Sequence, residues 1–142
     1  ADGVVRPDNG SPLSDRLAAL HAALHRIVVD FLPDEAAVEE TFANRNPAST
    51  LKLGQARGVV MLAPAQAGIP VAEYSANVIK KSLVGAGHAD KGQIGAMVKM
   101  LLPGSAANSA DAADALAVAV CHAHHLVTRR RWADGDGREV RL

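Results

Sequence analysis

Apolar residues recur every three or four positions over the segment that begins near Ser11 or Ser14, which predicts a helix with one buried face. The stripe consists of Leu13, Leu17, Leu20, Leu24, Ile27 and Phe31. Pro33 follows it and is expected to end the helix. A turn is predicted before it at Asp8-Asn9-Gly10, and Val4-Val5 is a short extended candidate.

Short apolar runs alternate with longer helical patterns through the rest of the chain. Strands are predicted over residues 35–42 and 69–74, the first with the buried run Ala36-Ala37-Val38. Helices are predicted over residues 47–66, 76–83, 90–102 and 110–127. This alternation indicates an α/β fold with a largely parallel sheet.

The composition limits the classes of protein to which the chain can belong. With 49% apolar residues and 142 positions, the chain is long and apolar enough for one folded domain, which excludes disorder. The 15 basic and 15 acidic residues cancel, so net charge names no partner. Cys121 is the single cysteine, and no signal peptide or long apolar span is present, so a cytoplasmic protein without a membrane partner is expected.

Asp111 and Asp114 are three residues apart at the start of a predicted helix. Carboxylates at this spacing lie on one helix face, with Cβ atoms roughly 5–6 Å apart, and suit a magnesium ion. They are equally suited to offset the positive end of the helix dipole. Glu39, at the end of a parallel strand where ligand-binding crevices form, is a candidate third ligand, and Glu40 points to the other side of the strand.

Three histidines follow the same helical pattern at His122, His124 and His125. They have no set of cysteine partners, so we do not expect a transition-metal site there. We interpret them as residues near the end of the helix, where the negative end of the helix dipole stabilises histidine.

Several segments, in order and with suitable spacing, closely resemble the RuvC family of crossover junction endodeoxyribonucleases, or Holliday junction resolvases. They are Ala37-Val38-Glu39-Glu40-Thr41-Phe42, Leu51-Lys52-Leu53-Gly54-Gln55-Ala56-Arg57-Gly58, Asp90-Lys91, and Ala110-Asp111-Ala112-Ala113-Asp114-Ala115-Leu116. The resemblance implies a ribonuclease H-like fold and a homodimer that nicks four-way junction DNA symmetrically, in recombination and repair. It also implies branch-migration motor proteins of the RuvA and RuvB type as partners.

By resemblance, Glu39, Asp111 and Asp114 match three of the family's four catalytic acids and would hold Mg²⁺, two ions per site, with Mn²⁺ as a substitute. Lys80 and Lys91 match basic residues near the scissile phosphate. Phe42 matches an aromatic that contacts opened bases. The expected DNA-contacting residues are Phe42, Arg45, Lys80, Lys81 and Lys91. Gly54 and Gly58 would pack either on the sheet or in the family's dimer contact.

The N-terminal part of the sequence departs from the family pattern, because no strand with an Ile-Asp-Pro-Gly-type motif precedes Val4-Val5. We therefore expect a ribonuclease H-like mixed sheet without its first strands and without the fourth acid. The Ala36–Val38 strand would then be left without a neighbour, with its backbone donors and apolar surface exposed. The sequence accordingly predicts an incomplete nuclease domain over residues 1–128 and a polar, mobile tail over 129–142. It also predicts either that these residues are a piece of a longer polypeptide or that the isolated chain folds poorly.

Three functions remain open on this basis. The first is a magnesium-dependent endonuclease that resolves Holliday junctions. The second is a catalytically deficient module that binds junction DNA. The third is a ribonuclease H-like enzyme acting on RNA, which the Leu51–Gly58 run and the Asp111–Asp114 spacing disfavour.

Overall fold

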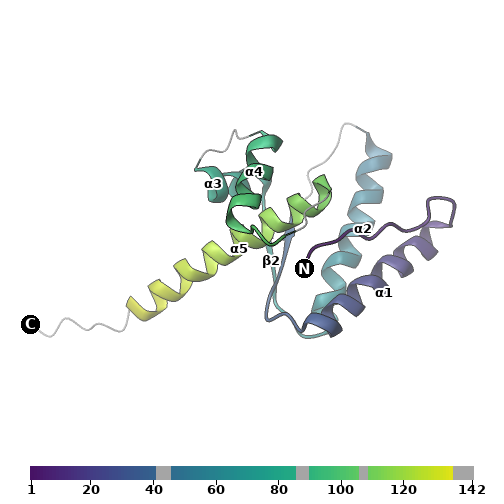
Figure 1. The fold of residues 1–142 in the computed structure, drawn as a ribbon. Coiled ribbons are helices and arrows are strands. Elements are labelled where there is room, and N and C mark those ends of the chain that lie inside the picture. Colours follow the sequence, from purple (N-terminus) through teal and green to yellow (C-terminus); the bar gives the residue numbers. More distant parts are fainter. Residues whose placement is uncertain (41–45, 86–89, 106–108, 136–142) are drawn as a thin grey trace, which may run out of the picture. The chain divides into compact units, whose positions relative to one another are not determined.

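The computed structural model describes residues 1–40, 46–85, 90–105 and 109–135, with the backbone alone at 91 and 130–135 (Figure 1). The chain divides into two units, Ala1–Ala76 and Asn77–Leu142. In the described ranges, no helix is long and apolar enough to cross a membrane.

The first helix, α1 (Leu13–Phe31), packs beside α2 (Pro47–Gln66) in the first unit (Figure 1). The leucine stripe is half-buried at Leu17, Leu20 and Leu24, which confirms the predicted apolar face. Its end is not covered, because Phe31 remains 62% exposed. The helix ends at Leu32, which adopts a left-handed φ of 44° and donates its N–H to Val28.

The predicted turn before α1 is confirmed, and the Asp8 carboxylate organises it. The N–H of Gly10 and the hydroxyl of Ser11 donate to this carboxylate at 3.2 and 3.0 Å. These hydrogen bonds, that of Gly10 first, lower the pKa of Asp8 because they favour its charged form.

Helix α2 has the predicted limits, Pro47 and Gln66. The side chain of Asn46 accepts hydrogen bonds from the N–H groups of Ala48 and Ser49, and Pro47 occupies the first position, where no N–H is needed. Pro64 lies inside the last turn, and the helix ends two residues later.

Strands β1 (Ala36–Glu39) and β2 (Val71–Tyr74) form a parallel pair in which Ala36 lies opposite Val71 and Glu39 opposite Tyr74. Helix α2 contacts both strands. The strands are shorter than predicted. The expectation that the Ala36–Val38 strand has no neighbour is wrong, because β2 supplies one. In the described ranges the sheet has these two strands.

Val4-Val5, predicted as a short extended segment, belongs to no strand among the described residues. An extended segment is stable as a strand only when its backbone groups find a neighbouring strand. The described residues offer it none.

The second unit contains α3 (Ala76–Val84, whose first residue closes the first unit), α4 (Lys91–Leu101) and α5 (Ala110–Gly135). Helix α4 packs on α5. Buried apolar side chains from the three helices form the core of this unit: Ile79, Leu83, Ile94, Val98, Ala112, Ala117, Val118, Val120 and Cys121.

Asp90 caps α4 in a capping box: its carboxylate accepts the N–H of Gln93, and the Gln93 side chain accepts the N–H of Asp90. Helix α5 is longer than predicted, since it continues past Val127 to Gly135. Arginine is a good helix former, so Arg129–Arg131 extend the helix instead of beginning the tail. Residues 136–142 of the predicted tail lie outside the described residues, and the domain limit at 128 stays a prediction.

Candidate active site

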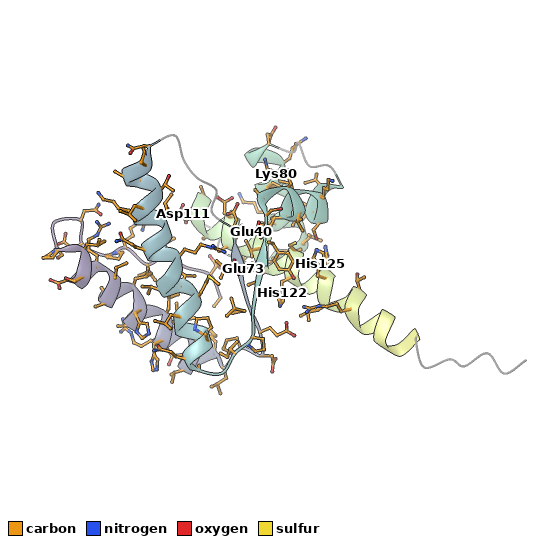
Figure 2. All side chains as sticks on the ribbon, turned by 180° about the vertical axis from the view of Figure 1, so that it is seen from behind. Glu40, Glu73, Lys80, Asp111, His122 and His125 are labelled. Carbon is orange, nitrogen blue, oxygen red and sulfur yellow. The ribbon has the colours of Figure 1, made fainter. Side chains whose placement is uncertain are left out.

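The aspartate pair lies on the first turns of α5, as predicted, and Figure 2 labels Asp111. Ser109 precedes the helix, and its hydroxyl accepts the N–H of Ala112 at 3.1 Å. This serine therefore performs the capping that an aspartate often performs. Asp111 is exposed and Asp114 half-buried, whereas Ala112 between them is 3% exposed and faces the core.

The donor set of this helix face suits a hard divalent cation. Two carboxylates from one side of a helix supply the oxygen ligands that magnesium prefers. They do not complete a site by themselves. Within either unit, the described residues assemble no group of three or more His, Cys, Asp or Glu that could hold a metal ion.

Glu39 is the last residue of β1 and is exposed. It lies opposite Tyr74, and the next residue, Glu40, donates its N–H to the Tyr74 carbonyl at 2.8 Å. The predicted position at a strand end is thus confirmed. Glu39 belongs to the first unit and the two aspartates to the second, so their joint ligation of a metal stays a prediction.

Two of the predicted basic residues lie on α3, where Lys80 is half-buried and Lys81 exposed (Figure 2 labels Lys80). Ile79 and Leu83, one turn apart, are buried and face the core of the second unit. Lys80 is therefore on the flank of the helix, where its amine can reach solvent along an apolar stem. Phe42, Arg45 and the side chain of Lys91 lie outside the described residues.

A hydrogen bond that the sequence did not reveal joins α3 to α5. Ser82 Oγ and His124 Nδ1 are 3.0 Å apart. This hydrogen bond adds a directional contact to the buried apolar contacts that Ile79 and Leu83 make from the same helix. Cys121 lies against the same serine: burial raises the pKa of its thiol, and the hydrogen bond with Ser82 opposes that rise.

The three histidines occupy the middle of α5 (Figure 2 labels His122 and His125). His122 is 7% exposed and part of the core. The expectation that they sit near the helix end is wrong, because α5 continues to Gly135. The helix dipole acts within the last turn, so it does not explain these residues.

Comparison with known proteins gives a consistent result. The family model described as "Crossover junction endodeoxyribonuclease RuvC" matches residues 1–122. The RuvC of Paramagnetospirillum magneticum is 62% identical over 138 residues, which cover 97% of this chain and 83% of that protein. The RuvC of Rhodospirillum rubrum is 62% identical over 125 residues, covering 88% and 74%.

Solved structures agree with the sequence relatives. The structure of Thermus thermophilus RuvC matches with a TM-score of 0.80 and 35% identity, over 89% of this chain and 76% of that one. The same enzyme in complex with a Holliday junction substrate matches with a TM-score of 0.82, over 87% and 76%.

Proposed function

Because the chain belongs to the RuvC family of crossover junction endodeoxyribonucleases and has its ribonuclease H-like fold, we propose that it resolves Holliday junctions by paired, symmetric phosphodiester hydrolysis in DNA recombination and repair. The observation that carries this proposal is the match over residues 1–122, which includes both helix-start aspartates. A cytoplasmic location without a membrane partner follows from the DNA substrate.

The family is metal-dependent, and the finer assignment is our proposal: Glu39, Asp111 and Asp114 hold Mg²⁺, two ions per site, with Mn²⁺ as a substitute. When bound there, the metal would supply Lewis-acid chemistry for the attacking water and the leaving oxygen. The carboxylates orient the ions. The contact of Ser109 supports this assignment. Because Ser109 caps α5, the Asp111 carboxylate is not needed as the cap and is available to bind metal.

The basic residues have a separate task in this proposal. Lys80 and Lys91 lie against the scissile phosphate, and Lys81 and Arg45 contact the backbone of the junction. Phe42 stacks on a base at the crossover. The half-buried position of Lys80 supports its assignment, since a stem held by packing directs the amine more narrowly than a solvated one.

Removal of the metal tests the reaction. With the polypeptide that its gene encodes, we expect nicking of a four-way junction in Mg²⁺ and none in EDTA, while a mobility shift still shows junction binding. The linear duplex of the same sequence is the control and should remain intact. Nicking in EDTA, equal cutting of the duplex, or preference for an RNA hybrid would contradict the proposal, and binding without nicking in Mg²⁺ would favour the deficient junction-binding module.

We further propose a homodimer, supported by one face of α2. Leu51, Gly54, Gly58 and Leu62 follow each other at three- and four-residue spacing and share this face. Leu51 is 65% and Leu62 47% exposed, and a Cβ at either glycine would meet no atom within 4 Å. The alternative that these glycines pack on the sheet is therefore wrong, and no described residue of the first unit covers this face, which we propose meets a second copy. Motor proteins of the RuvA and RuvB type are proposed as partners on family resemblance alone.

A larger side chain at Gly58 tests the dimer. The change Gly58→Leu should raise the dimer dissociation constant about tenfold or more, because overpacking an interface typically costs 1–3 kcal/mol. The monomer should stay folded, since leucine favours the helix and meets no neighbour there. Light scattering across a dilution series measures the effect. Lys52→Leu, which adds apolar bulk to the same helix outside the face, is the control, and equal effects of the two changes would contradict the assignment.

A further inference from the structure

An ion pair connects α2 to β2 in the first unit, and the proposed reaction does not use it. The guanidinium of Arg57 donates from Nη2 to Oε2 of Glu73, 16 residues further along the chain. The side chain of Arg57 is 25% exposed, and its Nε is buried without a hydrogen-bond partner among the described residues. This arginine is therefore held against the protein and is poorly placed to bind DNA phosphate.

The register of the sheet connects this ion pair to Glu39. Glu73 lies opposite Val38, and Tyr74 lies opposite Glu39. The Tyr74 carbonyl also accepts the N–H of Glu40 at 2.8 Å. Any displacement of the carboxyl end of β2 is thus transmitted to the backbone on both sides of Glu39.

The faces of the strands show that this influence is indirect. Side chains alternate between the two faces of a strand. Val38 and Glu73 share the face toward α2, and Figure 2 shows Glu73 on the strand beside that helix. Glu39 and Tyr74 share the opposite face. Arg57 therefore has no direct contact with the Glu39 face, and the strand backbone connects the two.

Both strands are held at two points. Each strand has four residues, and α2 contacts both of them. The ladder is tied at its start by the hydrogen bond from Ala36 N–H to the Pro70 carbonyl. At the other end, the Arg57–Glu73 ion pair fastens β2 to α2.

We propose that Arg57 and Glu73 are positioning residues, whose ion pair sets the carboxyl end of β2 and thereby the position of the Glu39 carboxylate in the metal site. This inference rests on the proposed role of Glu39. It differs from a purely stabilising ion pair, because an ion pair with this exposure contributes little to folding. Its effect on catalysis is larger, since a misplacement of about 1 Å can cost on the order of a hundredfold in rate.

Exchange of the two charges tests the inference in the polypeptide that the gene encodes. Arg57→Glu and Glu73→Arg should each lower kcat for junction nicking about 10- to 100-fold and raise the Mg²⁺ concentration for half-maximal rate, with junction affinity within about threefold. The double variant should restore kcat to within about fivefold of the original. Glu73→Gln, which keeps the shape of the side chain, should lower kcat in the same direction if a charge reversal prevents folding. Lys52→Glu reverses a charge elsewhere on α2 and should leave kcat unchanged.

Glu39→Gln separates this inference from the function on which it rests. Nicking by Glu39→Gln at the original rate would overturn the role of Glu39 itself. If Glu39→Gln is inactive, single variants that nick normally, or a double variant that stays impaired, overturn the positioning role. Loss of junction affinity in Arg57→Glu but not in Glu73→Arg also overturns it, because Arg57 would then contact DNA.

Discussion

Asp114→Asn is expected to lower the rate of junction nicking about a thousandfold, with junction affinity changed by less than about threefold. Asparagine keeps the shape of the side chain and removes the charge that holds a metal ion. Loss of such a ligand removes several kcal/mol of transition-state stabilisation, and about 4 kcal/mol corresponds to a thousandfold in rate. Single-turnover nicking in Mg²⁺ measures the rate, and a mobility shift measures the affinity.

The same variant separates catalysis from helix stabilisation. If Asp111 and Asp114 serve the helix dipole, their replacement by Asn should destabilise the protein by about 0.3–1 kcal/mol and leave nicking unchanged. Asp15→Asn, in the first turn of α1, is the matched control: it should show the dipole effect alone. If Asp114→Asn behaves like Asp15→Asn in both measurements, Asp114 is not a metal ligand.

Ile94→Ala is expected to reduce the free energy of unfolding by about 2–4 kcal/mol, because it opens a cavity where α4 packs on α5. Ile94 is 6% exposed. Met100→Ala removes a side chain that is 67% exposed from the same helix, and should change the free energy by less than about 0.5 kcal/mol. Urea unfolding followed by circular dichroism measures both. Similar losses in the two variants would show that α4 is not anchored as the structure describes.

The sequence predicts the helices and strands whose limits are determined by neighbouring residues. Pro47 and Pro64 mark the limits of α2, and the apolar run Ala36–Val38 predicts β1. The aspartate pair at the start of α5 was visible because three-residue spacing on a helix is a local property. The RuvC family and the α/β fold could also be predicted, since several motifs occur in order.

The remaining features depend on contacts between distant residues. The residues near Ser82 do not predict its contact with His124, and those near Arg57 do not predict its contact with Glu73. Both contacts form because helix packing brings together residues that are distant in the sequence. The capping of α5 by Ser109 has a local signal in the sequence, because a serine directly before a predicted helix is a typical N-cap. Helix α5 extends beyond the predicted Val127 because arginine favours helix, so the charged residues after Val127 continue it.

The pairing of β1 with β2 has a consequence for the choice between two identical carboxylates. Glu39 and Glu40 are neighbours with the same chemistry, and their places opposite and beyond Tyr74 distinguish them. Inserting or deleting one residue in β1 would slide the strand by one position and exchange the faces of the two side chains. The choice of Glu39 rather than Glu40 as the proposed ligand thus depends on the register of two short strands.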